Sequence, residues 1–133
     1  MVTSTFQATL GCDVRAVWRV VTSLEDHAWR SDICRIEILS ETQFREYTPG
    51  GVATTFTITA FEPCCLYAFE LENEQLSGRW TGRLFAVPGG TKVVFTERVA
   101  PRRWYLAPLV RLFLKRQQRI YFRDLKKKLQ AGT

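Results

Sequence analysis

The sequence predicts an α+β domain in which an antiparallel sheet of about seven strands wraps around one long C-terminal helix. From Val2 to about Arg98, apolar and polar residues alternate in short runs separated by Gly and Pro, which is the pattern of half-buried strands. From about Tyr105 to Leu129 the apolar spacing changes to the 3.6-residue period of a helix. With 133 residues, of which 46% are hydrophobic and 24% charged, residues 1–133 are expected to form a single domain.

The first strand is expected at Val2–Leu10, where alternate residues are apolar, and two short helices are expected to follow it. Asp13 is a good N-cap for the first of these helices. The apolar residues of that helix recur at helical spacing: Val14, Val17, Trp18 and Val21. A second short helix is expected at Leu24–Trp29, with Ser23 as its N-cap.

Six further strands are expected, at Arg35–Ser40, Gln43–Thr48, Val52–Glu62, Cys65–Glu72, Leu76–Val87 and Thr91–Arg98. Turns rich in Pro and Gly separate several of them, at Pro49–Gly51 and Pro88–Gly90. Alternation places Phe56, Ile58 and Ala60 on one face of their strand. Consecutive strands with such short connections predict an antiparallel meander.

The long helix has an apolar stripe that must be buried. Its members are Leu106, Val110, Phe113, Leu114, Tyr121 and Leu125. The only large partner in the chain is one face of the sheet. A curved sheet wrapped around a helix leaves space between the two, and such spaces are common ligand sites.

Four stretches carry a resemblance to a known superfamily: Val14–Trp18 (VRAVW), His27–Ile33 (HAWRSDI), Phe61–Phe69 (FEPCCLYAF) and Gly89–Arg98 (GGTKVVFTER). In this order and spacing the chain resembles the SRPBCC superfamily, which includes START lipid-transfer domains, polyketide cyclases and pathogenesis-related plant allergens. It looks like the small bacterial polyketide cyclase/dehydrase or lipid-transport members, most of which are of undefined function. The resemblance implies a helix-grip (START-like) fold, but no catalytic residue, because the superfamily has no universal catalytic set.

Ten residues are expected to line the space between sheet and helix: Trp29, Phe56, Ile58, Tyr67, Phe69, Trp80, Phe95, Phe113, Gln117 and Tyr121. The alternative is that these aromatic residues simply fill a core. Gly78 and Gly82 flank Trp80 on the same strand face and remove side-chain volume there, which favours a hollow. The Gln117 amide either orients a polar group of a ligand or pairs with a strand side chain or a water.

Five titratable residues are candidates for acid–base chemistry in such a space: Glu46, Glu97, Tyr67, Tyr121 and His27. A carboxyl group in an apolar cavity has a raised pKa and can act as a general acid or base. The facing of Glu46 and Glu97 stays open, because a register error of one residue reverses it. The four cysteines and the single histidine lack the spacing of a metal site, so no metal and no cofactor are expected.

The charge is strongly uneven: residues from Arg98 onward carry a net +10, and those before it a net −4. Arg111, Lys115, Arg119 and Arg123 form a basic stripe that either binds an anionic membrane or RNA or is an ordinary solvated face. The basic and aromatic residues of Arg102–Leu106 also suit a membrane interface. The sequence has no apolar run of about 20 residues and no signal-peptide pattern, so a cytoplasmic location is expected.

Three functions remain open from the sequence. The favoured one is the binding or carrying of a small hydrophobic molecule, such as a lipid, polyketide or aromatic compound. The second is a cyclase or dehydratase acting on a ketone-rich aromatic precursor. The third is a surface interaction module that uses the basic helix. Neither the identity of the ligand nor the oligomeric state follows from the sequence.

Overall fold

The structure, a computed structural model, describes residues 1–131. Seven strands, two α-helices and one 3-10 turn follow one another as β1 (Val2–Leu10), α1 (Val14–Thr22), β2 (Arg35–Ile38), β3 (Gln43–Tyr47), β4 (Ala53–Glu62), β5 (Leu66–Glu72), β6 (Leu76–Val87), β7 (Gly90–Pro101), η1 (Trp104–Leu106) and α2 (Ala107–Ala131). The expected antiparallel sheet and long C-terminal helix are confirmed.

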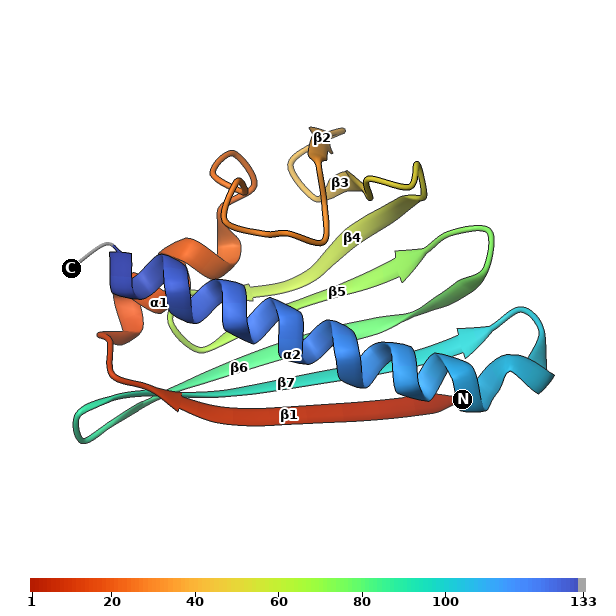
Figure 1. The fold of residues 1–133 in the computed structure, drawn as a ribbon. Coiled ribbons are helices and arrows are strands. Elements are labelled where there is room, and N and C mark those ends of the chain that lie inside the picture. The colour runs from red at the N-terminus through yellow and green to blue at the C-terminus, as the bar shows by residue number, and fades with distance from the viewer. Residues whose placement is uncertain (132–133) are drawn as a thin grey trace.

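The strands form one antiparallel sheet in the order β1-β7-β6-β5-β4-β3-β2. The chain therefore returns to pair its last strand with its first, and β2 forms the far edge. Helix α2 lies lengthwise across one face of the sheet and packs mainly on β1 and β7 (Figure 1). Because the helix leans toward the β1 edge, the inner face of β3–β6 is only partly covered by it.

Two buried clusters hold the helix on the sheet. One joins α1 and the C-terminal half of α2 to the sheet through residues such as Trp18, Phe95 and Leu125. The other lies under the first turns of α2 and includes Val99 and Leu114. Burial of large apolar side chains stabilises a fold by roughly 1.5–3 kcal/mol each, so these clusters fix the position of α2.

The second short helix expected at Leu24–Trp29 does not form. The Ser23 hydroxyl does accept a hydrogen bond from the Asp26 amide (3.1 Å), but the chain continues as bends and a turn. The Trp29 indole donates to the Asp26 carbonyl (3.1 Å). Six residues are too few to nucleate a stable helix without tertiary support, and the two hydrogen bonds of this segment are local side-chain bonds and not those of a helical backbone.

A β-bulge in β4 makes the predicted facing of Ala60 wrong. The register with β5 shifts between Ile58 and Ala60, so that Ala60 pairs with Ala68 and Phe61 pairs with Tyr67. Paired residues share a face, and a bulge reverses the alternation beyond it. Ala60 is therefore not on the face of Ile58, and Phe61 takes the inner face instead.

The two glycines of β6 do not leave empty space, contrary to the expectation. A Cβ at Gly82 would lie 2.8 Å from Cζ3 of Trp80, whose ring covers this glycine. A Cβ at Gly78 would meet the carbonyl oxygen of Arg98 and lie 2.8 Å from the Cα of Val99. Gly78 is thus required by the close approach of the β7 backbone.

Replacing Gly78 with Ala is expected to lower the free energy of unfolding by about 2 kcal/mol, because the methyl group overlaps a neighbouring backbone that cannot move aside cheaply. Urea denaturation measures the change. Gly11→Ala is the matched control, since a Cβ at Gly11 meets nothing within 4 Å. Equal stability of the two variants would contradict the packing described here.

Candidate functional site

A cavity of about 410 Å³ lies between the inner face of the sheet and α2. Nine of the ten residues expected there line it: Trp29, Phe56, Tyr67, Phe69, Trp80, Phe95, Phe113, Gln117 and Tyr121. Ile58 does not. It lies opposite Phe69 on the neighbouring strand and packs into the core clusters.

A second hollow, of about 940 Å³, lies on the outer face of the sheet and is more open. Its walls carry charged and hydroxyl side chains, such as Glu70, Arg79 and Arg98. An apolar ligand would gain little there, because these groups would lose water without acquiring partners. The more closed hollow, between the sheet and α2, is therefore the candidate site, although its volume is smaller.

Aromatic rings form a continuous wall across the inner face. The Phe69 and Trp80 rings are stacked with centroids 4.9 Å apart, and Trp80 lies 5.2 Å from Phe95. The Phe95 ring is 5.6 Å from Tyr121 of α2, in an edge-to-face arrangement. The wall therefore runs from β5 to the helix and offers flat apolar surfaces to a ligand.

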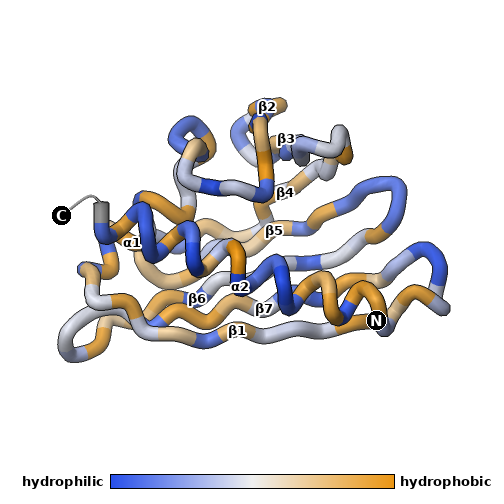
Figure 2. Tube along the Cα trace, in the orientation of Figure 1, coloured by the Kyte–Doolittle hydropathy of each residue, from blue (hydrophilic) through white to orange (hydrophobic). Residues whose placement is uncertain are grey.

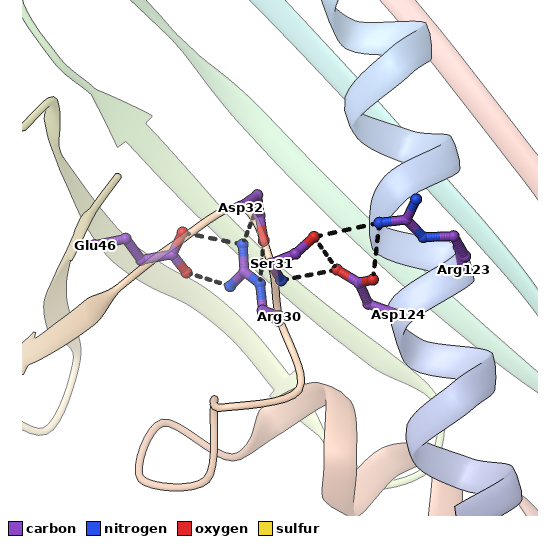
Figure 3. Close-up of polar contacts among 6 residues, drawn as sticks. All are labelled: Arg30, Ser31, Asp32, Glu46, Arg123 and Asp124. Atoms are coloured by element: carbon purple, nitrogen blue, oxygen red, sulfur yellow. Dashed lines mark hydrogen bonds and ion pairs between the residues drawn. The ribbon is translucent and has the colours of Figure 1, made fainter. Parts of the chain in front are cut away.

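One ion cluster interrupts this wall. Arg30 donates from Nη1 to Glu46 Oε2 (2.7 Å) and from Nη2 to Asp32 Oδ2 (2.8 Å), and all three side chains are 12–15% exposed (Figure 3). Burial acts to lower the pKa of Arg30, but the Glu46 and Asp32 carboxylates outweigh it and raise the pKa above its ordinary value. The guanidinium also lies 5.2 Å from the ring centroid of Tyr121. Arg30 therefore stays charged inside the cavity wall.

The loop that carries Arg30 is tied to α2 by the next residue. The Ser31 amide and hydroxyl both donate to Asp124 Oδ2, at 2.8 and 2.7 Å, and Arg123 contacts both residues (Figure 3). Burial acts to raise the pKa of Asp124, but the hydrogen bonds from Ser31 and Arg123 outweigh it and hold the pKa below its ordinary value. This link fixes Trp29 and Arg30 against the helix.

Glu97 lies on the inner face of β7, the strand next to the β1 edge of the sheet. Along β7 it alternates in phase with the buried Phe95 and Val99, and its cross-strand neighbours are Ser4 and Trp80. Burial raises the pKa of Glu97 to about 7; the Glu46 charge adds to this and Arg30 opposes it. Unlike Glu46, Glu97 has no hydrogen bond or ion pair with any residue in the described part of the chain.

Two phenol groups complete the polar part of the cavity. Burial raises the pKa of Tyr67 to about 12, with Glu46 adding to the effect, and burial also raises the pKa of Tyr121 above its ordinary value. Both are therefore neutral hydrogen-bond donors near pH 7. Neither hydroxyl has a hydrogen bond to another residue between 1 and 131.

One titratable candidate lies outside the cavity, and the most buried amide of α2 is not the one that the sequence suggested. His27 does not line the cavity and sits in the turn before Arg30, whose amide donates to the His27 carbonyl. The fully buried amide is Gln118, not Gln117: it accepts from the Ser4 hydroxyl (2.7 Å) and donates to the Ser4 carbonyl (3.0 Å). Gln117 is half-buried and lines the cavity.

The sequence matches, over residues 1–130, the family model described as polyketide cyclase / dehydrase and lipid transport. The chain belongs to this family. No curated protein matches it. No helix within residues 1–131 is both long and apolar enough to cross a membrane.

Solved structures share the fold of this polyketide cyclase/dehydrase and lipid-transport family member at low sequence identity. A START superfamily protein from Mycobacterium smegmatis is 11% identical with a TM-score of 0.89, covering 98% of this chain and 99% of the other. The Zhui aromatase/cyclase from Streptomyces sp. R1128 is 13% identical with a TM-score of 0.85, covering 96% and 93%. A conserved protein from Geobacillus kaustophilus is 12% identical with a TM-score of 0.85, covering 98% and 97%.

Sequence reasoning missed several residues that line the cavity of this family member, among them Arg30, Asp32, Ile33, Ile36, Phe44 and Leu71. Phe44 and Glu46 alternate in phase along β3, so an inward Phe44 would have implied an inward Glu46. For Arg30 the only signal is its place between Trp29 and Asp32 in the HAWRSDI stretch.

Proposed function

We propose that the protein binds or carries a small hydrophobic molecule, such as a lipid, polyketide or aromatic compound, in the cavity between the sheet and α2. The observation that supports this most is the aromatic wall around a space of about 410 Å³. Small-molecule sites of about 300–1,000 Å³ are typically lined by apolar and aromatic side chains with a few placed polar groups. The cavity has this composition.

The polar groups of the cavity suggest the kind of ligand. Tyr67, Tyr121 and the protonated form of Glu97 can each donate a hydrogen bond, and none is engaged by another residue within 1–131. The oxygen atoms of these three groups are not fully buried, because no fully buried side-chain nitrogen or oxygen atom in residues 1–131 lacks a hydrogen-bond partner. A ligand that covers them displaces water from them, so binding favours a ligand that accepts hydrogen bonds. The proposed ligand is therefore mainly apolar, with carbonyl or hydroxyl oxygens at one end.

Native mass spectrometry of the purified protein tests this proposal. We expect an added mass that is released on denaturation, or that appears when the protein is mixed with fatty acids or polycyclic phenols. Gln117→Trp, which places an indole at the cavity wall, is expected to reduce the added mass. Lys126→Trp, at an exposed position of the same helix, is the control. Absence of binding to every compound tested would argue against the proposal.

A second candidate, a cyclase or dehydratase, is favoured by one observation: the unpaired Glu97 carboxyl group with a pKa of about 7. Such a group exchanges its proton readily at neutral pH, which suits a general acid or base. Glu97 would take a proton from a carbon beside a ketone, while a Tyr67 or Tyr121 hydroxyl stabilises the developing charge on the ketone oxygen.

Exchange of the α-protons of a bound ketone distinguishes a carrier from an enzyme. A bound aromatic ketone in deuterated water would lose its α-proton signals in NMR spectra if Glu97 acts as the base. Glu97→Gln is expected to abolish this exchange while leaving binding within a few-fold. Exchange at the same rate in both proteins would remove Glu97 from the reaction, and no exchange above the buffer rate would favour a carrier.

A further inference from the structure

Large hydrophobic side chains are exposed together at the start of α2. Of the eleven exposed ones in residues 1–131, five fall between residues 104 and 113. Trp104 is 82% exposed, Leu112 is 69% exposed and Phe113 is 53% exposed. The other two exposed residues of this segment are Tyr105 and Leu109. The 3-10 turn η1 has no buried residue, and Trp104 and Tyr105 pack edge to face on each other. Apolar residues are frequent in this part of the helix (Figure 2).

These side chains share one outward face with basic residues. Leu109, Leu112, Phe113 and Arg116 recur at spacings of three and four, which aligns them along one side of a helix. Arg119 follows three residues after Arg116 and extends the same side. Arg103, Arg116 and Arg119 have no acidic partner among residues 1–131. No acidic residue occurs between Arg98 and Arg123.

We propose that this face, defined by Arg103, Trp104, Tyr105, Leu109, Leu112, Phe113, Arg116 and Arg119, docks on an anionic lipid membrane. It is called the docking face below. Interfacial helices combine large apolar side chains with Lys and Arg in this way, and Trp and Tyr favour the headgroup level. A nucleic acid would satisfy the arginines but leave Leu109 and Leu112 in water. An anionic membrane can bind the arginines at its headgroups and bury the apolar side chains.

The docking face is continuous with the candidate cavity. Phe113 belongs to this face and also lines the cavity. Val52, in the turn before β4, lines the cavity as well and is 40% exposed. The cavity wall therefore reaches the surface through apolar side chains, one of which lies on the docking face. A hydrophobic molecule would then pass between membrane and cavity with little contact with water.

Vesicle co-sedimentation tests this inference. The full chain is mixed with phosphatidylcholine vesicles, or with vesicles containing about one quarter phosphatidylglycerol, at about 0.05 M and about 0.5 M salt. We expect binding to the mixed vesicles, at least about tenfold weaker binding to pure phosphatidylcholine, and weakening at high salt, because the attraction of basic residues to an anionic surface is electrostatic and is screened by salt.

Two double variants separate the apolar and the basic contributions. Leu109→Ser/Leu112→Ser and Arg116→Gln/Arg119→Gln are each expected to weaken vesicle binding by about tenfold or more. The matched controls lie on the outer face of the sheet: Phe85→Ser, which replaces an exposed Phe, and Arg79→Gln/Arg83→Gln. These controls are expected to bind as the unaltered protein does.

The inference fails if no vesicle is bound, if the docking-face variants bind as well as the controls, or if a polyuridine oligomer is bound in preference to the vesicles. Binding of a small apolar fluorophore is measured on the same proteins, with circular dichroism to verify folding. Loss of vesicle binding with intact fluorophore binding supports the docking face. Loss of both in the folded variants would overturn its assignment as a surface separate from the cavity interior.

Discussion

Replacing Arg30 with Met is expected to lower the free energy of unfolding by about 4 kcal/mol. The guanidinium neutralises Glu46 and Asp32, which are both nearly buried. Without it, two carboxylates face each other in a poorly hydrated wall, and removing one partner of a buried ion pair costs about 3–5 kcal/mol. Met has a similar length and preserves much of the packing, so the loss reflects the uncompensated charges. Chemical denaturation at pH 7 measures it.

Two further variants test this explanation. Arg79→Met removes a cation whose contact with Glu70 is 3.9 Å long and exposed, so a change below about 0.5 kcal/mol is expected. The double variant Arg30→Met/Glu46→Gln is expected to recover part of the loss, because one of the stranded charges is removed. A loss of stability no greater than that of Arg79→Met would show that the ion cluster does not stabilise the fold.

Replacing Glu97 with Gln is expected to remove a pH dependence of stability of about 2–3 kcal/mol. The Glu97 carboxyl loses its proton at its ordinary pKa of 4.5 in the unfolded chain and at about 7 in the folded protein. Between these values the folded state binds the proton more tightly, so the stabilising contribution is present below about pH 4.5 and is lost as the pH rises to about 7. Each pH unit in this window corresponds to about 1.4 kcal/mol.

Denaturation curves at several pH values from 5 to 8 measure this effect. The stability of the unaltered protein is expected to fall relative to Glu97→Gln across this range and to run parallel to it above about pH 8. Glu70→Gln, on the solvated outer face opposite Arg79, is the control and should keep the slope of the unaltered protein. Parallel curves for the unaltered protein and Glu97→Gln throughout would contradict the burial of Glu97.

The alternation of apolar and polar residues predicts most of the strands. It also predicts which side chains face inward wherever a strand is regular. In β7, Val93, Phe95 and Val99 are buried in phase, and this phase places Glu97 inside. The facing of Glu97 could therefore have been derived from its own strand. In β4 the alternation fails after Ile58, because the bulge adds one residue that leaves no clear mark in the sequence.

The remaining differences arise from contacts between residues far apart in the chain. Arg30 meets Glu46 across 16 positions and Ser31 meets Asp124 across 93, so the loop that builds one wall of the cavity could not be derived locally. Phe113 follows the apolar period of the helix but is more than half exposed, because the first turns of α2 pack on the sheet through Val110 and Leu114 and Phe113 lies beside that contact. Helical periodicity predicts which residues form the apolar stripe, but it does not predict how the helix is tilted on the sheet.

A titration with the fluorophore N-phenyl-1-naphthylamine, whose emission increases in apolar surroundings, tests whether the space under α2 accepts an apolar molecule. We expect saturable enhancement with one probe per chain, retained in Lys126→Trp and strongly reduced in Gln117→Trp. If the probe gives no enhancement, or if both tryptophan variants bind it equally well, the side chains must close the space and the account is contradicted.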